Sequence, residues 1–120
     1  MSTPTVFVVE DDPKLNEIIT ITLQGNFEIE SCTDGNHAVE RLKQIVPDII
    51  VLDLNLPGVS GREILKNIRE DERLVNTRVI LTTADERQAE TLTNEADIIL
   101  LKPVSPLQLR ELALRMSTKK

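Results

Sequence analysis

Short apolar runs alternate with longer amphipathic segments along the chain. The apolar runs are Val6–Val9, Phe27–Cys32, Ile49–Leu52, Val79–Leu81 and Ile98–Leu101. Several of them are rich in valine and isoleucine, which is typical of strands buried on both faces of a parallel sheet. The pattern therefore predicts five strands, each followed by a helix.

The segments between these runs have helical spacing. In Pro13–Gln24 the positions i, i+3, i+4 and i+7 predict a sheet-facing side made of Leu15, Ile18, Ile19 and Thr22. The same reasoning places a further set of side chains inward, namely Ala38, Leu42, Ile45, Ile64, Leu65, Ile68, Leu109, Leu112 and Met116. Ser60 and Ser105 stand where helix N-caps are expected. Around Glu86–Glu95 the pattern is weak, and it predicts a short or mobile helix.

Five β-α units in series imply an α/β domain with a parallel sheet and helices on both of its faces. At 120 residues the chain has the length of one domain, and we expect residues 1–120 to form it. In such open sheets ligands bind outside the carboxyl ends of the strands. We therefore look for chemistry in the residues that follow each apolar run.

Charge and composition exclude several classes of function. The net charge of −6 repels phosphate backbones and anionic lipid heads, so direct nucleic-acid binding is not expected. No apolar run approaches the ~20 residues that span a bilayer, so membrane insertion is not expected. We expect the protein to be cytoplasmic. The single cysteine, Cys32, cannot form an internal disulfide and is expected to be a small buried side chain.

Charged and hydroxyl side chains follow the predicted strands. The first run ends in Glu10-Asp11-Asp12, the third in Asp53, the fourth in Thr82-Thr83 and the fifth in Lys102-Pro103. If the strand order is 2-1-3-4-5, these polar tips converge on one crevice. Several carboxylates that meet there need a counter-charge beyond one lysine.

A hard divalent cation with oxygen ligands provides that counter-charge, and Mg²⁺ suits a site of carboxylates, waters and a phosphate oxygen. Asp53 is then a candidate nucleophile toward phosphorus. Of the three acidic residues after the first run, Asp12 is better explained as the N-cap of the helix that starts at Pro13. Pro57-Gly58 after Asp53 suits a type II turn.

Taken together, the segments "VVEDD", "DLNLPGVSG", "VILTTA" and "LLKP" resemble the receiver domain of two-component response regulators. The similarity covers essentially the whole chain. It implies a flavodoxin-like (βα)5 doubly wound sandwich with a five-stranded parallel sheet of order 2-1-3-4-5.

The resemblance also assigns roles to individual residues. Asp53 is the expected phosphoacceptor, with Thr83 donating to the phosphoryl group and Lys102 pairing with it. Asp11 and Asp53 are expected to bind Mg²⁺ directly, or Mn²⁺ in its place, with Glu10 acting mainly through bound water. The backbone carbonyl of Asn55 is expected to complete the protein ligands. The corresponding Lys-Pro bond is commonly cis in this family, so the resemblance also predicts a cis Lys102–Pro103 bond.

The function implied is phosphorelay signal transduction. The phosphoryl donor is expected to be a sensor histidine kinase or a histidine phosphotransfer protein, and the signal is expected to leave through contacts with an unidentified downstream protein. A phosphorylation-dependent dimer is a further candidate. Such a protein catalyses only its own phosphorylation and dephosphorylation, and is not a conventional enzyme.

One residue departs from the family pattern. Three positions before the lysine the family usually has Tyr or Phe, whose ring turns inward on activation, and here the residue is Ile99. We expect phosphorylation to shift the loop after Thr83 and the fourth helix without an aromatic rotamer change.

Two alternatives stay open on the sequence alone. One is a pseudo-receiver that binds a partner without taking phosphate. The other is a haloacid-dehalogenase-like phosphatase, which requires a second aspartate two residues after the first, where this chain has Asn55.

Overall fold

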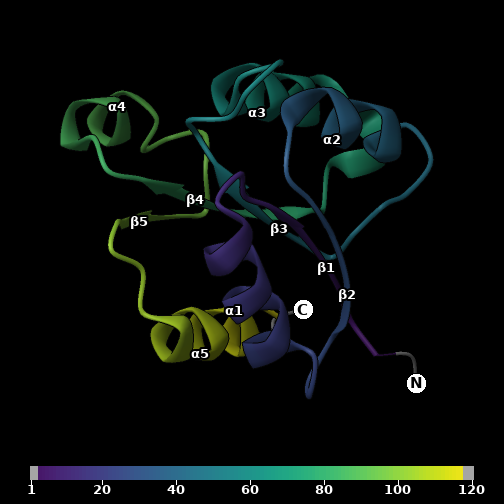
Figure 1. The fold of residues 1–120 in the computed structure, drawn as a ribbon. Helices are drawn as coiled ribbons and strands as arrows, with labels where there is room; N and C mark the ends of the chain where they lie inside the picture. Colours follow the sequence, from purple (N-terminus) through teal and green to yellow (C-terminus); the bar gives the residue numbers. More distant parts are fainter. Residues whose placement is uncertain (1–2, 118–120) are drawn as a thin grey trace.

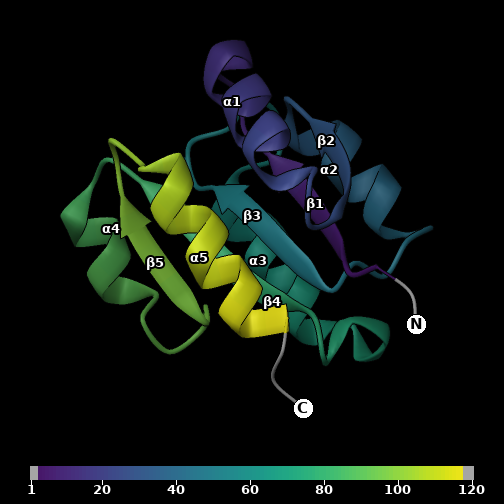
Figure 2. The same ribbon diagram turned by 90° about the horizontal axis from the view of Figure 1, so that it is seen from below.

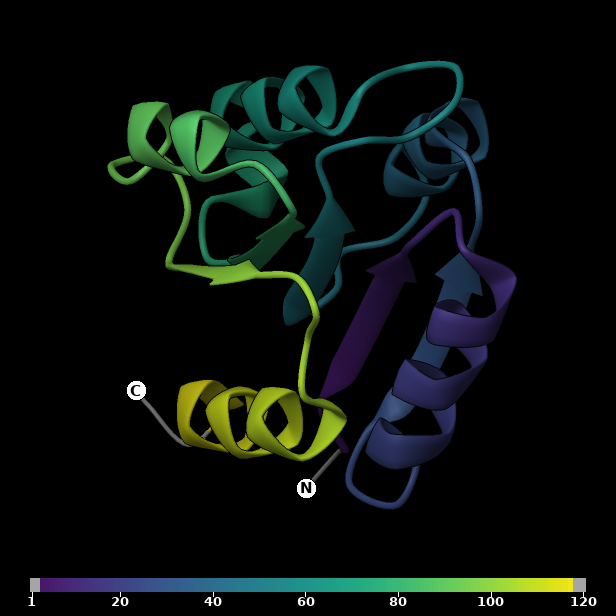
Figure 3. The same cartoon turned by 60° about the vertical axis from the view of Figure 1, so that its left-hand side comes forward.

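The structure, a computed structural model, describes residues 3–117. The five strands are β1 (Thr5–Val9), β2 (Glu28–Cys32), β3 (Ile49–Asp53), β4 (Arg78–Thr83) and β5 (Ile98–Leu101). They form one parallel sheet in the order β2-β1-β3-β4-β5, as predicted. Because every strand is parallel, all five carboxyl ends lie along the same edge; the arrowheads of the purple, blue and teal strands show this in Figure 3.

The helices cover both faces of the sheet (Figures 1 and 2). They are α1 (Pro13–Leu23), α2 (Gly35–Leu42), α3 (Gly61–Glu70), α4 (Glu86–Thr91) and α5 (Pro106–Ser117), with a short 3-10 turn at Glu72–Leu74. Helices α1 and α5 lie on one face, and α2 and α3 lie on the other. The fold is the predicted doubly wound α/β sandwich.

Alternate residues of each central strand point into two separate cores. Phe7, Val9, Ile50 and Leu52 pack with α2 and α3, whereas Val8 and Val51 pack with α1 and α5. The central strands β1, β3 and β4 therefore bury both faces, which explains why their sequences are continuous apolar runs rather than alternating ones. Phe27 and Cys32 are buried, as expected.

The predicted inner face of α1 is partly wrong. Ile18 is 47% exposed, and the buried residues of this helix are Asn16, Ile19 and Leu23. The helix is rotated so that the Asn16 amide reaches backbone carbonyls at the ends of β1 and β2, and this rotation turns Ile18 toward solvent. In α5, similarly, Ala113 is the buried residue between Leu109 and Met116, and Leu112 is only half-buried.

The other helix predictions agree with the structure in most respects. Ser60 Oγ accepts a hydrogen bond from the Glu63 backbone N–H at 3.2 Å, and Ser105 Oγ accepts one from Gln108 at 3.2 Å. Ile45 lies beyond the end of α2 but still packs against the core. Helix α4 has six residues, and none of these described residues is buried, which confirms that it is short.

No helix within residues 3–117 is long and apolar enough to cross a membrane. The cytoplasmic location expected from the sequence stays a prediction.

Candidate functional site

The acidic turn after β1 holds its carboxylates in different surroundings. Glu10 is only 1% exposed, whereas Asp11 is exposed to solvent. The Glu10 carboxylate accepts a hydrogen bond from the Asp12 backbone N–H at 3.1 Å. Asp12 is the N-cap of α1, and its side chain accepts from the Lys14 N–H at 3.0 Å, as predicted. Asp12 is therefore used as a helix cap, and Glu10 and Asp11 are the two carboxylates of this turn that can act in the site.

A buried amide fixes the position of this turn. Asn16 Nδ2 donates to the backbone carbonyls of Glu10 and Cys32, each at 3.0 Å. The two carbonyls belong to the ends of neighbouring strands, so one side chain ties the acidic turn to β2. The role of Asn16 is not evident from the sequence, because an asparagine between apolar positions of a helix gives no sign of which carbonyls it reaches.

Asp53 is the last residue of β3 and is 1% exposed. Its Oδ1 accepts from the Asn55 backbone N–H at 3.0 Å, which fixes the rotation of the carboxylate. The loop that follows returns close to Asp53: a Cβ placed on Gly61 would lie 2.2 Å from the Asp53 carbonyl oxygen. Gly58 has a φ of 76°, which fits the predicted turn at Pro57-Gly58.

The predicted acidic side chains come together. Carboxylate oxygens of Glu10, Asp11 and Asp53 lie within 4.8 Å of one another. Lys102 Nζ lies 3.2 Å from Glu10 Oε1 and 3.2 Å from Asp53 Oδ2, so the ammonium bridges the two buried carboxylates. The Lys102–Pro103 bond is cis, as the family resemblance led us to expect.

The charges in this cluster shift one another's pKa values. Burial raises the pKa of Glu10 to about 7, with a further rise from the Asp53 charge, against the opposing effects of the Asp12 N–H and Lys102. Burial also raises the pKa of Asp53. Burial alone would lower the pKa of Lys102, but the two carboxylates outweigh it and the pKa is raised. The site thus holds more negative charge than the lysine balances.

This donor set fits a hard divalent cation. Three carboxylates with one ammonium leave an excess of negative charge, and oxygen donors within 4.8 Å of one another are the ligands that such an ion prefers. Asn55 lies two residues after Asp53, and its backbone N–H is held by the hydrogen bond to Asp53 Oδ1.

Two threonines end β4, and they differ in their surroundings. Thr83 Oγ1 accepts from the Asp85 N–H at 3.0 Å and donates to Gln88 Oε1 at 3.3 Å, so its hydroxyl is engaged with the segment after β4 rather than with Asp53. Thr82 pairs with Asp53 across the strands, and within residues 3–117 its buried hydroxyl has no hydrogen-bond partner. Thr83 was predicted as a site residue, whereas neither the unpartnered hydroxyl of Thr82 nor the contact of Thr83 with Gln88 has a signal in the sequence.

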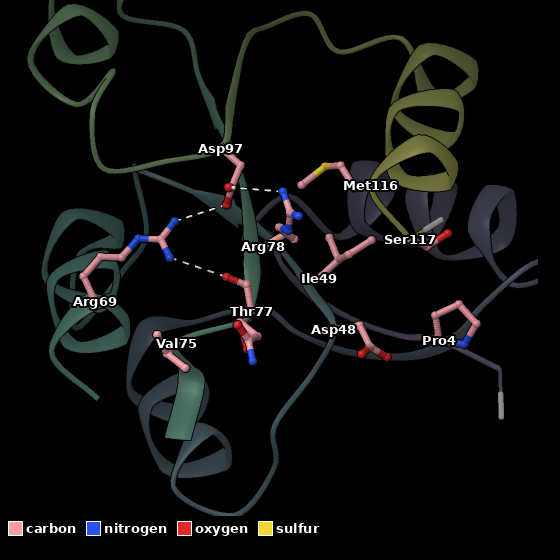
Figure 4. Close-up of a pocket in the computed structure, with 11 residues that line it drawn as sticks. Pro4, Asp48, Ile49, Arg69, Val75, Thr77, Arg78, Asp97, Met116 and Ser117 are labelled. Carbon is pink, nitrogen blue, oxygen red and sulfur yellow. Dashed lines mark hydrogen bonds and ion pairs between the residues drawn. The ribbon is translucent and has the colours of Figure 1, made fainter. Parts of the chain in front are cut away.

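A second hollow lies far from this chemistry. A cavity of about 460 Å³ is lined by Arg69, Thr77, Arg78 and Asp97, near the amino-terminal ends of β4 and β5 (Figure 4). Asp97 pairs with Arg69 at 3.2 Å and with Arg78 at 3.8 Å, and it also accepts from the Val79 N–H at 2.7 Å. Because one carboxylate links two guanidinium groups and a strand N–H, we interpret these contacts as structural, joining α3, β4 and the residue that precedes β5.

The model of the response regulator receiver domain family matches residues 6–114. The chain is 33% identical over 120 residues to the hybrid signal transduction histidine kinase D of Dictyostelium discoideum, covering 98% of this chain and 8% of that protein. It is 32% identical to the DNA-binding response regulator MtrA of Mycolicibacterium smegmatis, covering 87% of this chain and 46% of the relative. Among solved structures, the chemotaxis response regulator CheY4 of Vibrio cholerae matches with a TM-score of 0.86 and 26% identity, over 96% of this chain and 99% of that one.

The fold and the family match thus define a receiver domain of two-component signalling, a class whose members are phosphoacceptor switches. The chain belongs to the response regulator receiver domain family. Receiver domains act in phosphorelays with histidine kinases or phosphotransfer proteins, and they are switches rather than conventional enzymes. The chain spans less than half the length of the curated relatives named here, so their other activities are not carried over to it.

Proposed function

We propose that Asp53 accepts a phosphoryl group in a Mg²⁺-dependent reaction and that the residues gathered around it serve this transfer. The observation that carries the proposal is the arrangement of Glu10, Asp11 and Asp53 within 4.8 Å, with Lys102 between two of them. A structural acidic turn has no need of a half-buried lysine that follows a distant strand.

In the proposed transfer a carboxylate oxygen of Asp53 forms a bond to phosphorus as the bond from phosphorus to the donor histidine nitrogen breaks. The electron pair of the broken P–N bond stays on the imidazole nitrogen. The imidazole leaves as the neutral ring if its other nitrogen carries a proton, and otherwise takes a proton from solvent. Asp53 becomes an acyl phosphate. Hydrolysis by water later restores the carboxylate and releases inorganic phosphate. The protein catalyses only these two steps on itself.

The chain's own residues prepare Asp53 for this reaction. The Asn55 N–H holds one carboxylate oxygen and Lys102 holds the other, so the nucleophile is oriented before a donor arrives. The Lys102 ammonium is positioned to pair with the negative charge on the transferred group. Thr83, at the end of the neighbouring strand, would donate its hydroxyl to the same group once it leaves its present partner.

The proposed metal ligands are the carboxylates of Asp11 and Asp53 and the backbone carbonyl of Asn55, with Glu10 acting through water. Mn²⁺ would serve in place of Mg²⁺. When bound, the ion would neutralise carboxylate charge and polarise the phosphoryl oxygens.

We further propose that residues 1–120 form a single receiver domain in the cytoplasm. Its phosphoryl donor would be a sensor histidine kinase or a histidine phosphotransfer protein, and its output would be contacts with another protein or a phosphorylation-dependent dimer. The acidic surface, with a net charge of −6, argues against direct binding of nucleic acid.

Neither sequence alternative has comparable support. The phosphatase alternative needs an aspartate where Asn55 stands, and the family match is to receiver domains. The pseudo-receiver alternative predicts that the acidic residues have no shared task, whereas here three carboxylates lie within 4.8 Å of one another and a lysine contacts two of them.

Intact mass spectrometry after incubation with Mg²⁺ and acetyl phosphate tests the proposal. We expect one phosphoryl increment in the wild type and none in Asp53→Asn or after removal of Mg²⁺ with a chelator. An unmodified wild type, under conditions in which a known receiver domain is labelled, would favour the pseudo-receiver. Steady hydrolysis of a generic phosphate ester would favour the phosphatase.

A further inference from the structure

The Thr83 hydroxyl makes two hydrogen bonds that hold it away from Asp53. It accepts from the Asp85 N–H at 3.0 Å and donates its proton to Gln88 Oε1 at 3.3 Å. A hydroxyl has a single proton to donate. Thr83 can therefore donate to Gln88 or to a phosphoryl oxygen on Asp53, but not to both at once.

Gln88 belongs to α4, so its hydrogen bond with Thr83 links the end of β4 to this helix. The residue is half-buried, and its backbone carbonyl accepts from Thr91 Oγ1 at 2.9 Å. The same Thr91 oxygen accepts from Arg62 Nη2 of α3 at 3.2 Å. A chain of polar contacts thus leads from Thr83 through Gln88 and Thr91 to the neighbouring helix.

These polar contacts matter because the first turn of α4 has no buried side chain. None of the six described residues of the helix is buried, and its apolar anchor is the C-cap Leu92, which is 2% exposed and packs in the core at the far end. Gln88 also borders a cavity of about 540 Å³, lined in part by Asn55 and Arg62, which gives its side chain space to move. The far end of the segment is better anchored, because Arg69 Nε donates to the Glu95 carbonyl at 2.6 Å.

The usual hydrophobic route from threonine to output is missing here. Ile99 packs against the core on the α3 side of the sheet and has no ring to swing. A β-branched side chain is also restricted about χ1. A signal that starts at Thr83 needs another path, and the hydrogen bond to Gln88 is a path that the structure shows.

We propose that Gln88 is a positioning residue that holds the Thr83 hydroxyl away from the acceptor and couples its release to α4. This inference rests on the proposed phosphorylation of Asp53. When Thr83 donates to a phosphoryl oxygen, Gln88 loses its donor, and the first turn of α4 is free to move relative to Arg62. By linkage, the bond to Gln88 opposes phosphoryl binding to the same extent that phosphoryl binding weakens the bond.

The test uses beryllofluoride with Mg²⁺ as a stand-in for the phosphoryl group, titrated against the full chain. Gln88→Leu keeps the size of the side chain and removes its acceptor, so we expect beryllofluoride to bind about twofold to tenfold more tightly, which corresponds to one net hydrogen bond. Gln88→Ala serves as a second variant if the leucine alters α4. Gln108→Leu, at an exposed position of α5, is the matched control and should bind like the wild type.

A double-mutant cycle separates positioning from a general effect on stability. In the Thr83→Ala background there is no hydroxyl to release, so Gln88→Leu should leave the affinity unchanged. The Thr91 methyl resonance should shift when beryllofluoride binds to the wild type, and this response should be lost in Gln88→Leu.

The outcomes distinguish this inference from the function on which it rests. If the wild type binds no beryllofluoride in the presence of Mg²⁺, the proposed function fails. If the wild type binds it but Gln88→Leu and Gln88→Ala bind equally well or more weakly, or if the gain persists without the Thr83 hydroxyl, then the role of Gln88 is wrong and the proposed function stands.

Discussion

The ammonium of Lys102 lies 3.2 Å from the Asp53 carboxylate, although the two residues are 49 positions apart in the chain. The contact joins the ends of β3 and β5, with β4 between them in the sheet. It depends on the strand order, so the site exists only when the whole sheet has formed.

Replacing Asp53 with asparagine should stabilise the metal-free protein. Asparagine keeps an oxygen for the Asn55 N–H but removes one of the buried charges that crowd Glu10. We expect the free energy of unfolding in urea, measured with a chelator present, to rise by about 1–3 kcal/mol. Asp12→Asn is the control, because asparagine caps a helix as well as aspartate does. A loss of stability in Asp53→Asn would show that the carboxylates do not repel one another.

Asn16→Ala should destabilise the protein and displace the acidic turn. The substitution leaves the buried carbonyls of Glu10 and Cys32 without their side-chain donor. We expect the free energy of unfolding to fall by about 2–3 kcal/mol. Asn67→Ala, at an exposed position of α3, should change it little. Equal behaviour of the two variants would contradict the structural role given to Asn16.

Gly61→Ala should disturb the loop beside Asp53. The new Cβ would lie 2.2 Å from the Asp53 carbonyl oxygen and 2.6 Å from Leu54 Cα, and neither backbone atom can move without shifting β3. We expect a loss of about 1–3 kcal/mol in the free energy of unfolding, as for an overpacked core. Gly25→Ala is the matched control, because no atom lies within 4 Å of its added Cβ. Unchanged stability in Gly61→Ala would mean that the loop is held more loosely than the structure indicates.

The ion pair between Arg41 and Glu30 should make a small contribution to stability that depends on pH. Arg41 holds the pKa of Glu30 below its ordinary value of 4.5, mainly through their hydrogen bonds, one of them 2.8 Å long. A carboxylate whose folded pKa is depressed stabilises the fold above its unfolded pKa and loses this effect as the pH falls through the folded value. Arg41→Ala should therefore be less stable than the wild type at pH 7, and the difference should shrink below about pH 4.5. A difference that stays constant between pH 7 and pH 3 would exclude this cause.

Much of the fold could be predicted from the sequence because the central strands β1, β3 and β4 bury both of their faces. Such strands appear as apolar runs, and residues that follow the runs meet at one edge of a parallel sheet. Glu10, Asp53 and Lys102 were located in this way before any contact was known. Asp12 could be separated from them because helix capping has its own sequence signal.

What the sequence could not predict depends on rotations and partners. Nothing in the apolar spacing of α1 shows that it turns Asn16 inward and Ile18 outward, because both choices leave an amphipathic helix. The partner of the Thr83 hydroxyl is equally hidden, since Gln88 belongs to a helix with a weak pattern. These features are set by tertiary contacts rather than by local preference.

Direct localisation of the phosphoryl group tests the central claim most sharply. After incubation with Mg²⁺ and acetyl phosphate, sodium borohydride reduces an aspartyl phosphate to homoserine, and peptide mass spectrometry then locates the altered residue. We predict that the altered residue is Asp53, and that Glu10, Asp11 and Asp12 stay unmodified. A reduced residue at any other position, or a labelled protein in which Asp53 is intact, would contradict the account.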